Sequence, residues 1–242
     1  MPQDSRDVKP DRQDARDRRR AERRAEMVAA AMDAVREHGP GVSIAQIAAA
    51  AGITKPVLYR HFDDRADLQR AVGTASAEIL MSRIWPTLAI EAEPVEHVVA
   101  IIDAFLAGIE DEPQLWRFVV HNPAEPAAGA EIVDDVRSQI AALLATIIGE
   151  RLRAEGRDSG GAEAWAYGLV GMVQSAGDWW LDRRTMSRDA LTNYLTTLIW
   201  GGIASVAGID SPTAAADVLR LVPDPVPGPV TPEKTEKEAT DG

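Results

Sequence analysis

The sequence predicts an all-α protein with a small N-terminal helical domain and a larger C-terminal one. Alanine is abundant, and no segment shows the alternation of β-branched and polar residues that is typical of strands. Glycine and proline fall at the positions where helices with apolar residues at helical spacing would end. With 242 residues, of which 45% are hydrophobic, the chain is long enough to bury a sizeable core.

The N-terminal part is expected to begin with a disordered arm over residues 1–17, which are highly charged and contain no secretory signal. A first helix is expected over residues 18–38, because Met27, Ala31 and Val35 recur at helical spacing. The segment Gly39-Pro40-Gly41 should end this helix.

Two short helices are expected next, at residues 44–50 and 55–61. Ser43 and Gln46 fit a capping box, in which each residue bonds the backbone of the other. Gly52 can adopt the left-handed conformation of a tight turn, and Thr54 can cap the second helix. Two helices joined by a short turn with glycine predict a helix-turn-helix, so residues 18–63 form the expected three-helix DNA-binding domain.

The second domain is expected over residues 64–209. Its first helix should run from Asp64 to Pro86, where proline should break or kink it. Further helices are expected over residues 95–110, 113–121, 125–154, 162–183 and 188–207. Residues 210–242 are expected to be a flexible tail, because they are rich in proline and acidic residues with little to bury.

Charge is distributed unevenly along the chain. The net charge is −12, but residues 1–70 hold 14 Lys and Arg against 12 Asp and Glu, while the remainder holds 12 against 26. Contact with a polyanion is therefore expected only at the N-terminal end.

Enzymatic activity is not expected. The chain has no cysteine, its four histidines lie far apart in sequence, and it contains no nucleophile elbow or phosphate-binding loop. We therefore predict no catalytic residue, no metal site and no cofactor.

Residues 190–209 carry no charge over twenty positions, which is about the length that a membrane span needs. Thr and Asn residues dilute this stretch, and no Lys or Arg cluster flanks it closely. A helix buried at an interface is the favoured interpretation, with the protein in the cytoplasm.

The second short helix has one apolar side and one polar side. At 100° per residue, Leu58 and Phe62 fall together and should face the core. The opposite side presents Pro56, Tyr59 and Arg60, with Lys55 and Val57 at its edges. Any one of these residues could belong to an ordinary solvated face, but together they favour a helix that enters the major groove of DNA, where Arg can read guanine.

The segment VSIAQIAAAAGITKPVLYRHFDDRADL resembles the DNA-binding part of the TetR family of transcriptional regulators. The resemblance implies binding to a double-stranded DNA operator. It assigns phosphate contacts to Ser43, Thr54, Lys55, Tyr59, His61 and Arg65, and base contacts to Arg60 and Val57. His61 also lies near the core side, so a structural hydrogen bond is an equal alternative for it.

Pro56 stands where this family usually has glycine. Proline has no N–H, so a backbone bond to phosphate is impossible there, and a contact with a thymine methyl group is conceivable. The arginine run that leads into the first helix has two open interpretations, an arm in the minor groove or a solvated segment. It comprises Arg16, Arg18, Arg19, Arg20, Arg23 and Arg24.

Small residues follow one another at helical spacing in the last two helices. Glycine inside a helix costs about 1 kcal/mol relative to alanine, so a closely packed helix should compensate for it. In the TetR family these helices form a four-helix bundle with their symmetry mates, which implies a homodimer; packing within one chain is the alternative. The residues assigned to dimerisation are Gly168, Gly171, Ser175, Trp179, Leu198, Gly201 and Ser205.

An apolar effector pocket is expected in the C-terminal domain, because five of the six tryptophans lie between residues 85 and 180. Gln174 and Asp178 add polar groups one turn apart, and Asp178 could orient a ligand or pair with Arg183, Arg184 or Arg117. The residues assigned to a hydrophobic small-molecule effector are Trp85, Phe105, Trp116, Leu144, Trp165, Gln174 and Asp178, with Phe118 as a further wall.

The sequence therefore predicts a ligand-responsive transcriptional regulator. It is expected to repress from a palindromic operator as a homodimer, and to be released by a hydrophobic effector. A DNA-binding architectural or interaction protein without a small-molecule effector is the alternative.

Overall fold

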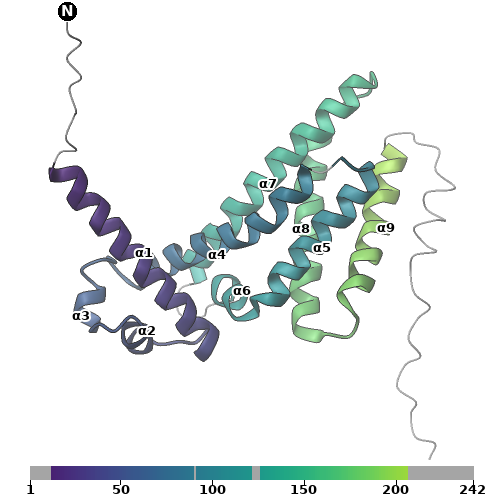
Figure 1. The fold of residues 1–242 in the computed structure, drawn as a ribbon. Coiled ribbons are helices and arrows are strands. Elements are labelled where there is room, and N and C mark those ends of the chain that lie inside the picture. The colour runs from purple at the N-terminus through teal and green to yellow at the C-terminus, as the bar shows by residue number, and fades with distance from the viewer. Residues whose placement is uncertain (1–11, 90, 122–125, 207–242) are drawn as a thin grey trace, which may run out of the picture.

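The computed structural model describes residues 12–89, 91–121 and 126–206, and these residues form nine α-helices (Figure 1). The expected tail, residues 210–242, lies outside the described residues, as do residues 1–11 of the expected arm. The helices are α1 (Arg12–His38), α2 (Ile44–Ala50), α3 (Lys55–Leu58), α4 (Arg65–Leu88), α5 (Pro94–Asp111), α6 (Pro113–Val120), α7 (Pro126–Ala154), α8 (Ala162–Arg183) and α9 (Arg188–Val206).

Helix α1 begins earlier than the sequence predicts. Residues 12–17, expected to belong to a disordered arm, are helical and continue α1 without a break. Because Arg, Gln and Ala all favour helix, the high charge of this stretch does not prevent it. The N-terminal part of α1 extends beyond α2 and α3 in Figure 1.

Helix α3 is shorter than expected, and α4 is longer. Regular α3 ends at Leu58, and Arg60 and His61 then donate to carbonyls three residues earlier, which tightens the chain into a turn. Pro86 does not break α4, which continues to Leu88. Pro86 lies in the last turn of α4. It removes one backbone hydrogen bond there, close to the end of the helix, where several backbone groups lack helical partners in any case.

Two hydrophobic cores hold the helices together. The first joins the helix-turn-helix to Leu115, Phe118 and Val119 of α6 and Ile132 of α7. The second joins α5, α8 and α9 around Leu106 and Trp180. This first core contains residues from both sides of the expected domain boundary, between residues 63 and 64. The helix-turn-helix is therefore packed directly against the larger domain.

Close helix packing depends on two glycines whose role is not evident from the sequence. A Cβ added to Gly73 would lie 2.3 Å from Ile132, and one added to Gly108 would lie 2.4 Å from Leu80. These glycines bring α4 close to α7 and to α5. The described helices include no candidate for a membrane span.

Candidate DNA-binding surface and ligand cavity

The capping and turn chemistry of the helix-turn-helix is as predicted at two of three positions. Ser43 and Gln46 form the capping box of α2, and Gly52 has a φ of +65° in the turn. Thr54 occupies the N-cap position of α3, but its side chain makes no capping hydrogen bond. The helix starts instead with the backbone carbonyl of Thr54, which accepts hydrogen bonds from the N–H groups of Val57 and Leu58. Thr54 is exposed, so its hydroxyl can bind another group.

The exposed side of α3 carries the residues predicted to contact DNA. Leu58 and Phe62 are fully buried and anchor the segment. Lys55, Pro56 and Arg60 are exposed, Val57 is half-buried, and Tyr59 is 44% exposed despite its large ring. Within the described residues, the side chains of Lys55, Tyr59 and Arg60 have no hydrogen-bond or ionic partner. They are therefore free to bind an external ligand.

Of the other three predicted DNA contacts, Ser43 and Arg65 are engaged within the protein. The Ser43 hydroxyl both donates to Gln46 Oε1 and accepts from its backbone. Arg65 donates to the Val42 carbonyl across 3.4 Å. His61 is half-buried, and its Nδ1 is buried without a hydrogen-bond partner among the described residues.

Arg24, which the sequence groups with the basic arm, has a structural role instead. It binds both carboxylate oxygens of Asp67, at 2.7 and 3.1 Å, and it donates to the carbonyl of His61. Its guanidinium also lies over the ring of Phe62, 4.3 Å from the centroid. Arg24 thus fastens α1 to the first turn of α4 and to the end of residues 55–62, which we call the recognition segment. The hydrogen bond from Arg24 lowers the pKa of Asp67, although partial burial opposes this shift.

We expect Asp67→Asn to lower the stability of the protein near neutral pH but not in acid. A carboxyl whose pKa is depressed by folding stabilises the protein above its unfolded pKa, and this contribution disappears as pH falls through the folded pKa. The decrease in the free energy of unfolding should be about 1–2 kcal/mol at pH 7. The difference between the melting temperatures of the two proteins should shrink progressively as pH falls below the ordinary pKa of an aspartate, and a difference that stays constant into strong acid would contradict the assignment.

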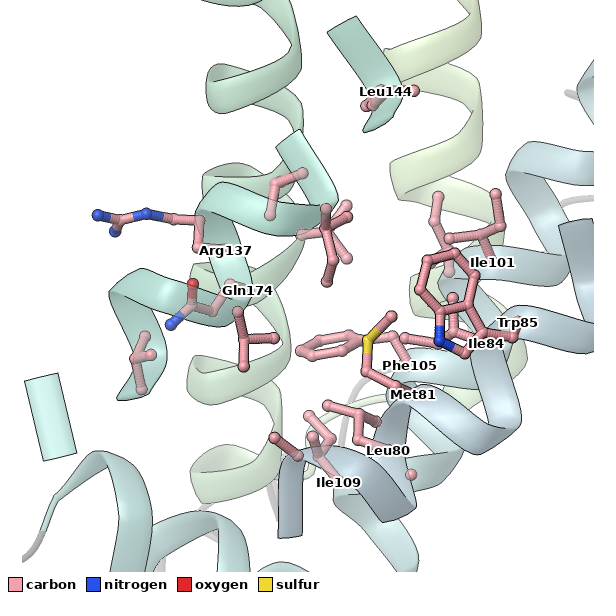
Figure 2. A pocket seen from close by; sticks show the side chains of 18 of the residues that line it. Leu80, Met81, Ile84, Trp85, Ile101, Phe105, Ile109, Arg137, Leu144 and Gln174 are labelled. Carbon is pink, nitrogen blue, oxygen red and sulfur yellow. The ribbon is translucent and has the colours of Figure 1, made fainter. Parts of the chain in front are cut away.

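A cavity of about 230 Å³ lies among the six helices α4 to α9 and is lined almost wholly by apolar side chains. Five of the predicted effector residues line it: Trp85, Phe105, Trp116, Leu144 and Gln174. Figure 2 shows Phe105, Met81 and Leu80 together, with the polar ends of Arg137 and Gln174 on one side and Trp85 on the other.

The residues that line the cavity extend along two helices. Its walls follow α4 from Gly73 to Leu88 and α7 from Ile132 to Ile147. Each of these stretches rises about 22 Å at 1.5 Å per residue. Trp85, which is 51% exposed, also borders a second hollow on the outside of α4 and α7, beside Glu78 and Asp135. Trp85 therefore lies at an edge of the cavity.

Trp165 and Phe118 do not line the cavity, contrary to expectation. Trp165 is 38% exposed, and its ring covers Gly161 at the start of α8. Phe118 belongs to the first core, under the helix-turn-helix. Their helical spacing alone could not tell which face of each helix meets the cavity, because that depends on how the helices cross.

Asp178 also lies outside the cavity wall, and its partners differ from those predicted. The indole N–H of Trp116 donates to Asp178 Oδ1 at 3.0 Å, and His121 Nε2 lies 2.9 Å from the same oxygen. The expected arginines bind elsewhere, Arg117 to Asp182 and Arg184 to Glu110. Trp116 of α6 lines the cavity and packs edge-on against Phe105. Asp178 of α8 therefore holds a residue of the cavity wall in position, although it does not line the cavity itself.

A second contact joins the cavity to the DNA-binding helices. Glu112, a wall residue at the start of α6, accepts two hydrogen bonds from Arg36 of α1, at 2.8 and 2.9 Å. This ion pair links residues 76 positions apart. No local pattern around either residue could have predicted it.

Most residues predicted to mediate dimerisation lie on an exposed face of α8 and α9. Gly168, Ser175 and Gly201 are exposed, and no atom lies within 4 Å of a Cβ added to Gly168, Gly171 or Gly201. The large side chains on this face are exposed too: Trp179 44%, Tyr194 47% and Leu198 64%. The side chain of Ser205 lies outside the described residues. In contrast, Gly177 packs against Phe105 within the chain.

Comparison with known proteins identifies both halves of the chain. Residues 27–72 match the family described as bacterial regulatory proteins, tetR family, and residues 83–215 match the tetracyclin repressor-like C-terminal domain. The uncharacterized HTH-type transcriptional regulator Rv0472c of Mycobacterium tuberculosis is 33% identical over 214 residues, which cover 88% of each chain. The HTH-type transcriptional activator FasR of Mycolicibacterium smegmatis is 27% identical over 77% of this chain and 85% of its own.

Solved structures share the fold. A tetR-family transcriptional regulator from Streptomyces coelicolor superposes with a TM-score of 0.61 at 21% identity, covering 84% of this chain and 88% of its own. The fatty acid degradation regulator FadR from Bacillus halodurans gives a TM-score of 0.58 at 15% identity, covering 73% and 93%. The helix-turn-helix, the nine-helix layout of the described residues and these matches agree: the chain belongs to the TetR family of HTH-type transcriptional regulators.

Proposed function

We propose that this regulator binds a palindromic operator as a cytoplasmic homodimer, represses from it, and is released by a hydrophobic small-molecule effector. One observation carries the proposal: the apolar cavity is bounded by α4, whose first turn is fastened to the DNA-binding helices. A ligand that changes the position of α4 would therefore change the position of α3.

The dimer is supported by the exposed face of α8 and α9. Large apolar side chains stand there around glycines that leave open space within the protomer. A second copy of the same face can fill that space, and such an isologous contact generates a two-fold axis. A two-fold dimer presents two recognition segments, which suits a palindromic operator.

The effector is supported by the shape and lining of the cavity. An apolar cavity that follows about 22 Å of two helices suits an extended hydrocarbon chain better than a compact polar molecule. A fatty acyl chain meets this description. The name of FadR, a fatty acid degradation regulator that shares the fold, is consistent with it.

Release from DNA follows from the two links between the cavity and the DNA-binding helices. Arg65 and Asp67 of α4 contact Val42 and Arg24, and Glu112 of the cavity wall contacts Arg36 of α1. An effector that binds better to a conformation with altered α4 and α6 shifts the population toward it. The two recognition segments would then no longer match the spacing of the half-sites.

The proposal is tested by selection of bound sequences from random duplexes, with Tyr59→Ala and Arg60→Ala beside the wild type. We expect a palindrome for the wild type. Tyr59→Ala should weaken binding to all sequences alike, because phosphate contacts carry no sequence information. Arg60→Ala should relax one base position in each half-site, at a cost of about 1–3 kcal/mol.

Absence of any enriched sequence, even at low salt, would contradict the proposal. Thermal stabilisation by long-chain acyl compounds distinguishes an effector-responsive regulator from an architectural protein, since a ligand of the folded state raises the melting temperature. A reporter gene placed under the selected operator gives the sign of regulation, which matters because FasR is named an activator.

A further inference from the structure

The N-terminal half of α1 carries a row of arginines on one side. Arg16, Arg19, Arg20 and Arg23 are all exposed, and at 100° per residue they fall within an arc of about 100°. Asp14, Asp17 and Glu22 fall outside this arc. We call these four arginines the α1 arginine row. The separation of charge is invisible in the linear sequence, where arginine and acidic residues alternate over residues 14–26.

The α1 arginine row has few partners in the part of the chain that the structure describes. Arg23 pairs with Glu26 at 2.7 Å, an exposed contact on the same helix. Arg16, Arg19 and Arg20 form no hydrogen bond or ion pair with any other described residue. These three guanidinium groups, without a partner among the described residues, repel one another, so this surface favours a polyanionic partner.

The direction of the row follows from Arg24. Arg24 contacts His61, Phe62 and Asp67, so this side of α1 faces the end of the recognition segment. At 100° per residue, Arg20 lies about 40° from Arg24 around the helix and Arg16 about 80°, whereas Arg23 and Arg19 lie about 100° and 140° away. The row therefore borders the side of α1 that carries Arg24, and over about 12 Å from Arg24 to Arg16 it follows the part of α1 that extends beyond α2 and α3 (Figure 1).

We propose that the α1 arginine row is a second DNA-contact surface, which binds the phosphate backbone beside the half-site occupied by α3. This inference rests on the proposed DNA-binding function. The sequence allows these arginines to belong to an arm in the minor groove. In this proposal they instead project from a continuous helix, α1, toward the phosphates. Contacts of this kind extend the footprint and hold the orientation of the protein without reading bases.

The test compares the full-length protein with Arg16→Gln/Arg19→Gln/Arg20→Gln. Glutamine keeps the helix propensity and removes the charge. The matched control is Arg151→Gln/Arg153→Gln/Arg157→Gln, which removes three charges at the far end of α7 and just after it. Dissociation constants for the selected palindrome are measured from about 50 to about 300 mM salt, beside those for an unrelated duplex.

We expect the row variant to bind both duplexes at least about tenfold more weakly at low salt, and the control to bind like the wild type. The slope of log K against log salt should fall by about 0.9 for each phosphate that the variant no longer neutralises. An unchanged slope, or a weakening confined to particular base pairs beside the half-site, would overturn the inference. Failure of the wild type to bind any duplex would instead overturn the proposed function as well.

A second variant, Ala21→Pro, distinguishes a continuous helix from a flexible arm. It keeps every arginine but interrupts α1, because proline lacks the N–H that would bond to Asp17 and clashes with the preceding turn. We expect binding as weak as that of the row variant. Wild-type affinity and slope in Ala21→Pro would show that the arginines act from a flexible segment, and would overturn the role of the helix.

Discussion

Gly171→Arg should yield a folded monomer that no longer holds its operator tightly. Gly171 lies in the row of small residues on α8, with open space around the position of its Cβ. Arginine there meets no atom of its own chain and is a better helix former than glycine by about 0.8 kcal/mol. In a dimer formed through this face, however, each arginine would bring a bulky charged side chain into the interface and oppose its formation.

The consequence for DNA binding should be large. A monomer contacts one half-site, and the second half-site no longer adds to the affinity. We expect the affinity for the palindrome to fall by on the order of 100-fold or more. Sedimentation velocity gives the oligomeric state, and circular dichroism establishes that the helices are retained.

The matched control is Ala142→Arg, which places the same charge on the exposed side of α7. It should remain a dimer with wild-type affinity. A dimeric Gly171→Arg would place the interface elsewhere and would leave the exposed Trp179, Tyr194 and Leu198 without the partner proposed for them.

Leu144→Trp should produce a regulator that stays on DNA in the presence of effector. Leu144 is a half-buried wall residue of the cavity on α7. The larger indole would occupy part of a space of about 230 Å³ that is otherwise open to a ligand. The residues that fasten α1 to α4 and α6 lie far from this end of the cavity, so DNA binding itself should persist.

Two measurements check this prediction. Acyl compounds that raise the melting temperature of the wild type should raise that of Leu144→Trp much less, and should release it from the operator only at concentrations at least about tenfold higher. Ala142→Trp adds the same ring outside the cavity and should respond like the wild type. Unchanged ligand stabilisation in Leu144→Trp would place the effector elsewhere.

The recognition segment could be predicted from the sequence because its determinants are local. The capping box of Ser43 and Gln46, the left-handed Gly52 and the apolar pair Leu58 and Phe62 each act within a few residues, and the structure contains all of them. Helix boundaries in the C-terminal domain were likewise predictable within two residues, although α4 continues past Pro86 to Leu88. Capping, turn and periodicity rules concern neighbours along the chain.

The cavity and its links were decided by the tertiary structure. Helical spacing made Trp116 and Trp165 equally good candidates for the cavity wall. The way α5, α6 and α8 cross places Trp116 in the wall and Trp165 over Gly161. The pairing of Arg36 with Glu112 and of Asp178 with Trp116 spans 76 and 62 positions. Such contacts follow from how whole helices pack, because the side chain that meets a partner depends on the position of both helices rather than on the sequence around either one.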